Sequence, residues 1–174
     1  MARARKAVAY RRIKRPYTRK SKYRELSYVR ASPVSKVVRY DMGETKKKFP
    51  ITLELISDAN LQIRHNAIES ARLTGNRLLE KKLGKNGFFM QLRMFPHHIL
   101  RENPLASGAG ADRMSTGMAR SYGKAIGIAA QITQGKVLFV VGVEEKDIEI
   151  GKKALLRAQY KLPCHCRIVM RKNE

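Results

Sequence analysis

Positive charge is spread so unevenly along this chain of 174 residues that only part of it can build a compact domain. The formal net charge is +23, and residues 1–48 hold 17 Lys and Arg side chains against three Asp and Glu. Repulsion of this size opposes a compact state unless a polyanion supplies counter-charge. The charge therefore predicts a polyanionic partner, either nucleic acid or an anionic membrane, with an acidic protein partner or charge kept for solubility as the alternatives.

Residues 1–35 are predicted to be a basic extension. The segment shows no helical or alternating apolar face, and Pro16 and Pro33 break any long helix. It cannot build a core of its own, so we expect a polyanion to order it on binding. A disordered solubility tail is the alternative. In an RNA-binding extension, Lys and Arg would meet phosphates and Tyr would stack on unpaired bases; the candidates are Arg11, Arg12, Lys14, Arg15, Tyr17, Arg19, Lys20, Lys22, Tyr23 and Arg24.

Residues 36–174 are predicted to form one globular domain of the α+β class. Apolar residues at every second position predict strands near 38–42, 51–55, 88–94, 126–132, 137–143 and 166–170. Helical spacing predicts helices over 59–83 and 148–162, the second with Asp147 as N-cap and stopped by Pro163. Clear alternation favours a mostly antiparallel sheet, so we expect a two-layer sandwich with both helices on one sheet face.

Residues 101–124 lose the regular apolar period and are predicted to be a long, flexible, Gly-rich internal loop. Its basic residues, Arg101, Arg113, Arg120 and Lys124, could reach into folded RNA, and a disordered surface loop is the alternative. The glycines near 108–117 match neither the phosphate-binding loop of nucleotide hydrolases nor the dinucleotide-binding motif. No nucleotide cofactor is therefore expected.

The chain offers little that indicates catalysis or metal binding. Cys164, His165 and Cys166 lack the spacing of structural zinc ligands, so we predict no metal and regard them as strand residues. His97 and His98 have no nucleophile at motif spacing, so neither an enzyme nor a small-molecule substrate is expected. Two cysteines in total fit a reducing compartment, and no apolar run approaches a membrane span of about 18 residues.

Four segments resemble one known family: "RRIKRPYTRKSKYRE" at 11–25, "MFPHHILREN" at 94–103, "GAGADRMSTGMARSYGKAIGIAAQI" at 108–132 and "RAQYKLP" at 157–163. The family is the archaeal and eukaryotic large-subunit ribosomal protein L ten e, whose bacterial counterpart is L sixteen. The resemblance covers nearly the whole chain. The intact GADR-type loop, and an end soon after "RIVMRKNE", favour an archaeal source.

The resemblance implies an α/β-hammerhead type of domain in a structural constituent of the large subunit of the cytoplasmic ribosome. Its partners would be large-subunit rRNA, tRNA and other large-subunit proteins, with no catalytic residues and no cofactor. The family's loop points toward the aminoacyl site and the peptidyl-transferase region, which singles out Arg101, Gly108, Gly110, Asp112, Arg113, Gly117, Arg120 and Lys124. A basic chromatin-type DNA-binding protein shares the charge and is the alternative, and an RNA-modifying enzyme would need a cofactor motif that is not evident.

Overall fold

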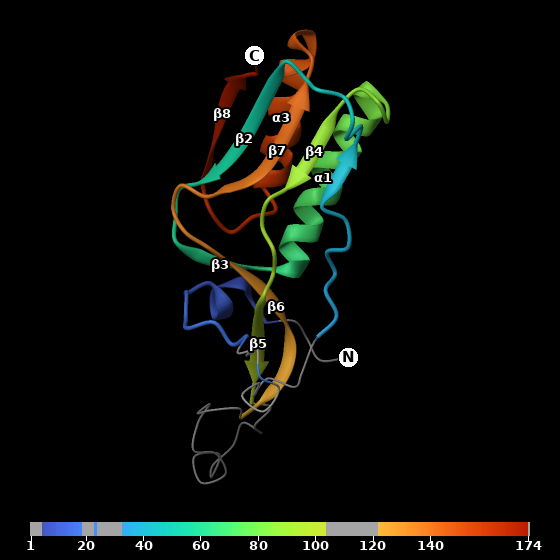
Figure 1. Ribbon diagram of the computed structural model, residues 1–174. Helices are drawn as coiled ribbons and strands as arrows, with labels where there is room; N and C mark the ends of the chain where they lie inside the picture. The colour runs from blue at the N-terminus through green and yellow to red at the C-terminus, as the bar shows by residue number, and fades with distance from the viewer. Residues whose placement is uncertain (1–4, 19–22, 24–32, 104–121, 174) are drawn as a thin grey trace.

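The computed structural model describes residues 5–18, 23, 33–103 and 122–173. Two antiparallel sheets make up its β-structure (Figure 1). The larger has the order β1-β4-β7-β2-β8, with bounds Asp41–Gly43, Phe89–Leu92, Val137–Val143, Ile51–Ser57 and Cys166–Lys172. The smaller has the order β3-β6-β5, with bounds Leu61–Arg64, Lys124–Ile132 and His98–Glu102.

Two α-helices, α1 (His65–Leu83) and α3 (Ile148–Gln159), pack side by side on one face of the five-stranded sheet (Figure 1). The alternation in β2 sends Leu53 and Leu55 inward, where both are fully buried. Each helix packs against this face with a stripe of buried apolar and small residues at helical spacing. The stripes are Ile68, Ala71, Gly75 and Leu79 on α1, and Gly151, Ala154, Leu155 and Ala158 on α3. The α+β class and the antiparallel pairing predicted from the sequence are confirmed.

Gly75 lies in the middle of α1, where a glycine costs about 1 kcal/mol relative to alanine. A Cβ atom placed there would lie 3.5 Å from the carbonyl oxygen of Ala154 and 3.7 Å from the Cβ of Ala158. It would also lie 3.1 Å from the terminal methyl of Met90. The contacts with α3 are ordinary van der Waals distances, so a methyl group would fit between the helices and only the flexible end of Met90 would have to shift.

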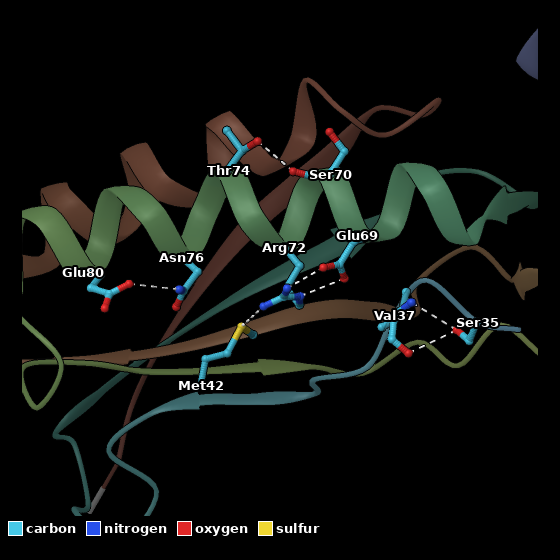
Figure 2. A network of polar contacts seen from close by, with 9 residues as sticks. All are labelled: Ser35, Val37, Met42, Glu69, Ser70, Arg72, Thr74, Asn76 and Glu80. Carbon is cyan, nitrogen blue, oxygen red and sulfur yellow. Dashed lines mark hydrogen bonds and ion pairs between the residues drawn. The ribbon is translucent and has the colours of Figure 1, made fainter.

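A partly buried ion pair ties α1 to the sheet edge (Figure 2). Arg72 grips the carboxylate of Glu69 through two guanidinium nitrogens, and its Nε lies 2.9 Å from Glu69 Oε2. The same guanidinium donates to the sulfur of Met42 in β1 at 3.2 Å. Because Glu69 lies one helical turn before Arg72, its carboxylate holds the Arg72 guanidinium in place and directs it toward β1.

Three sequence predictions need correction. The helix predicted over 59–83 begins only at His65, because residues 61–64 form β3 and pair with β6 in the second sheet. Leu61 and Ile63 alternate as a strand requires, but Leu61 also lies seven residues before Ile68, at the spacing of the helix stripe, so the two signals overlapped. The second helix ends at Gln159 rather than 162, and a turn leads to Pro163.

The third correction concerns the loop predicted over 101–124. Arg101 and Glu102 belong to β5, and β6 begins at Lys124, so both ends of that range are strand. A register shift between Leu100 and Arg101 disturbs the alternation there, which hid the strand from the sequence pattern. Within the described ranges, neither helix is both long enough and apolar enough to cross a bilayer.

Candidate nucleic-acid interface

Residues 10–14 lie beside the small sheet (Figure 1). They dock on it through backbone carbonyl groups. The backbone N–H of Gln62 in β3 donates to Arg11 O at 2.8 Å. The side-chain amide of Gln62 donates to Arg12 O at 2.6 Å and to Tyr10 O at 3.3 Å. Gln131 of β6 donates to Lys14 O at 2.6 Å. Two glutamines thus hold the segment by its main chain.

Gln62 and Gln131 face each other in the β3–β6 register, and the amide of Gln131 also donates to Gln62 Oε1 at 3.0 Å. Gln62 is 4% exposed, so its amide needs partners inside the protein. The carbonyl groups of the extension supply them. The two glutamines, called the glutamine pair, are anchoring residues that the sequence reasoning missed. A glutamine between the apolar Leu61 and Ile63 of a strand was the available signal.

Docking through the main chain leaves the basic side chains of this segment on the surface. Arg11, Arg12, Lys14 and Arg15 are all exposed, and none of them takes part in an ion pair among the described residues. The structure therefore brings four of the predicted phosphate ligands together on a short, fixed length of chain. Fixed, exposed cations are suited to binding a phosphate backbone.

A second anchor lies at Tyr17, where the extension meets β5. The backbone N–H of Tyr17 donates to His98 Nδ1 at 2.7 Å, and Ile99 N–H donates to Tyr17 O at 3.4 Å. The Arg101 guanidinium lies 3.8 Å from the centre of the Tyr17 ring, and it donates to Tyr122 O at 2.6 Å. Arg101 thus joins the extension to the residues that lead into β6. The Tyr17 ring has a cationic partner within the chain, and its stacking on a base stays a prediction.

His98 must be neutral to accept the Tyr17 hydrogen bond through Nδ1. Burial lowers the pKa of His98, and the nearby charges of His97, Arg101 and Lys14 lower it further. His65 at the start of α1 behaves in the same way: burial first, then Lys36 and Arg64, lowers its pKa. His65 Nδ1 accepts the backbone N–H of Lys36 at 3.3 Å. Both histidines are held in the form that accepts these bonds.

The start of the described chain is fixed by charge. Arg5 forms an ion pair with Glu102 at the end of β5, and Arg64 donates to Arg5 O at 2.9 Å. The Arg64 guanidinium also lies 5.8 Å from the centre of the Tyr10 ring. Residues 5–18 are therefore anchored on the domain, whereas the sequence analysis expected a polyanion to order residues 1–35 on binding.

The remaining candidates divide into two groups. Tyr23 is exposed, and Lys124 is exposed at the start of β6, opposite Glu102 in the strand register. The others lie outside the described residues: Arg19, Lys20, Lys22, Arg24, Gly108, Gly110, Asp112, Arg113, Gly117 and Arg120. Within the residues that the structure describes, no group of three or more His, Cys, Asp or Glu side chains is placed to hold a metal ion.

Comparison with known proteins identifies the family. Residues 13–169 match the family model described as ribosomal protein L16p/L10e. The chain is 45% identical over 161 residues to the large ribosomal subunit protein uL16 of Methanococcus maripaludis, covering 92% of this chain and 90% of the relative. It is 41% identical over 167 residues to the protein of that name from Archaeoglobus fulgidus, covering 96% and 92%. The chain therefore belongs to the ribosomal protein L16p/L10e family.

Proposed function

We propose that this chain is a structural constituent of the large subunit of the cytoplasmic ribosome, where it binds ribosomal RNA and neighbouring ribosomal proteins. The relatives are named as large-subunit ribosomal proteins, and membership of this family makes the chain a ribosomal protein and not an enzyme. One observation carries the RNA-binding mechanism: the glutamine pair fixes the main chain of residues 10–14 while the basic side chains point outward.

The energetic argument rests on counterions. Each phosphate that a Lys or Arg neutralises releases condensed counterions, so binding weakens as salt rises. A docked segment has already lost part of its chain entropy, and binding therefore costs less than ordering a fully flexible tail. The exposed guanidinium and ammonium groups of Arg11, Arg12, Lys14 and Arg15 are the proposed phosphate ligands. The same role is proposed for Arg19, Lys20, Lys22 and Arg24, which lie outside the described residues.

The finer family features are also part of this proposal. We propose that the chain divides into a basic extension at 1–35 and a domain at 36–174, with the phosphate ligands on the extension. Two sheets with two helices on one face support the proposal of an α/β-hammerhead type of domain. The β5–β6 pair ends at Glu102 and Lys124, so the Gly-rich segment between them leaves from the end of a paired ribbon. We propose that this segment contacts tRNA near the aminoacyl site and the peptidyl-transferase region, with Arg101, Arg113 and Arg120 holding it against rRNA or tRNA.

The test of RNA binding is the salt dependence of affinity. Replacing Arg11, Arg12, Lys14 and Arg15 with glutamine should make the slope of log K against log salt shallower by about 3 to 4, at about 0.7 to 0.9 per phosphate lost. The matched control replaces four other exposed cations, on the helices and their ends: Lys81, Lys82, Lys152 and Lys153. Equal slope changes in the two variants, measured on large-subunit rRNA, would refute the proposed interface.

The tRNA role has a separate test. Deleting residues 103–115 should leave rRNA affinity nearly unchanged while lowering peptide synthesis by reconstituted subunits. Normal synthesis by such subunits would contradict the loop's role without touching the extension. Binding of duplex DNA as tightly as rRNA at the same salt would instead favour the chromatin-type alternative.

A further inference from the structure

The only two cysteines of the chain lie together where the chain enters β8. Cys164 Sγ and Cys166 Sγ are 3.6 Å apart, within hydrogen-bond distance for sulfur. We propose that Cys164 and Cys166 form a thiol–disulfide exchange site, which reacts with low-molecular-weight disulfides and closes into an internal disulfide. This proposal is independent of the RNA-binding surface.

The geometry brings the two sulfurs within reach of a bond. Cys166 is the first residue of β8, an edge strand, and lies opposite Ser57 of β2. Cys164 lies in the bend that follows Pro163, and the hydroxyl of Ser57 donates to its sulfur at 4.0 Å. A disulfide bond is about 2.05 Å long, so the sulfurs must move about 1.5 Å closer. Two residues of chain span at most about 7 Å, close to the largest Cα separation that a disulfide accepts.

Both thiols are half-buried against the edge of the core, so each keeps a path to solvent. His165 between them is exposed and points away from the core. Because no third ligand completes a metal site here among the described residues, the pair is better suited to redox chemistry than to metal binding. A half-buried site of this kind admits a small disulfide more readily than another folded protein.

Electrostatics gives the two sulfurs different roles. The hydrogen bond with Cys166 lowers the pKa of Cys164, with help from the Ser57 hydroxyl and the charge of Arg11, against burial and the charge of Asp58. The same contact with Cys164 raises the pKa of Cys166, and burial adds to it. Thiolate is the nucleophile in exchange reactions. Cys164 is therefore the attacking sulfur, and Cys166 is the sulfur that resolves the mixed disulfide.

The exchange balances in two steps. The Cys164 thiolate attacks one sulfur of a small disulfide, the S–S bond breaks, and one small thiolate leaves. The Cys166 thiol then gives up its proton and attacks Cys164 Sγ, which expels the second small thiolate. The protein dithiol loses two electrons and becomes a disulfide. The small disulfide gains those electrons and, with the two protons from the cysteines, becomes two thiols.

The test uses the full-length chain, first reduced and then placed in glutathione buffers of increasing oxidised fraction. After acid quenching and alkylation, trypsin releases residues 162–167 with both cysteines on one peptide. The expected product has neither cysteine alkylated and a mass 2 Da below that of the free dithiol. Cys166→Ser should stop at one stable glutathione adduct on Cys164, and Cys164→Ser should form its adduct at least tenfold more slowly.

Three outcomes would overturn the proposal. Two glutathione adducts on one chain would show that the sulfurs do not close, and alkylated thiols in fully oxidised buffer would show that they do not react. Disulfide-linked dimers on a non-reducing gel would show that pairing occurs between chains instead. Circular dichroism of both serine variants checks that a lost reaction does not come from a lost fold.

Discussion

The glutamine pair gives the sharpest test of how the extension is held. Gln62→Leu removes three side-chain hydrogen bonds, to Tyr10 O, Arg12 O and the Gln131 amide, at 3.3, 2.6 and 3.0 Å. It preserves the backbone bond from Gln62 N–H to Arg11 O and roughly preserves side-chain volume. Each bond contributes about 0.5 to 1.5 kcal/mol net. Water can reach the freed carbonyl groups at the surface, which puts the loss at about 2 kcal/mol.

A loss of this size raises the undocked fraction of the extension about 30-fold. Limited trypsin digestion measures that fraction when opening and closing are fast relative to cleavage. We expect cleavage after Arg11, Arg12 and Lys14 to speed up by that factor, while the bond after Arg15 resists because Pro16 follows it. Gln134→Leu, at an exposed turn position, is the matched control and should leave these rates unchanged. Unchanged cleavage in Gln62→Leu would refute docking through the glutamine amides.

Three further predictions concern the domain itself. The fold lowers the pKa of His98, so the neutral ring stabilises docking of the extension above about pH 6.5. This contribution is lost as the pH falls through the folded pKa. His98→Asn should therefore remove the pH dependence of extension docking from the trypsin assay. Gly151→Ala places a Cβ 2.6 Å from a methyl group of Leu53 and should lower the free energy of unfolding, measured by urea titration, by about 1 kcal/mol. Gly75→Ala crowds only the flexible end of Met90, so the same titration should find it neutral or stabilising. Arg72→Met leaves the partly buried Glu69 carboxylate without its cationic partner and should lower the free energy of unfolding by about 2 to 3 kcal/mol. Adding Glu69→Gln should recover most of that loss. No recovery in the double variant would contradict the ion-pair explanation.

The sequence was sufficient to predict the elements whose period extends over many residues. The strands around Leu53 and Val141 and the helix stripe from Ile68 to Leu79 are long enough for alternation and helical spacing to be distinguished. The four residues of β3 were not, because Leu61 also lies at helical spacing from Ile68, seven residues later. Only pairing with β6, far along the chain, decides the strand.

The sequence was sufficient to name basic residues of the candidate site, but not the contacts that anchor them on the domain. Basic residues in an apolar-poor segment indicated phosphate binding without any structure. The anchors could not be predicted, because they use main-chain carbonyls and a glutamine more than 50 residues away, as in the bond from Gln62 to Tyr10 O. Hydrogen bonds to a main-chain carbonyl leave no pattern in the side chains of the segment that is held. Arg101 was expected to touch RNA or tRNA; in the structure its guanidinium lies against the Tyr17 ring, directly after the register shift in β5.

The attachment of residues 10–14 by carbonyl oxygens has an evolutionary consequence. Such an oxygen is present whatever side chain the residue bears, so selection can exchange arginine for lysine there without altering the path of the chain. The cations are thus able to drift and follow changes in a nucleic-acid partner. Gln62 and Gln131 are more constrained, because a shorter side chain would not reach the carbonyl oxygens and an acidic side chain would have no N–H to donate to them.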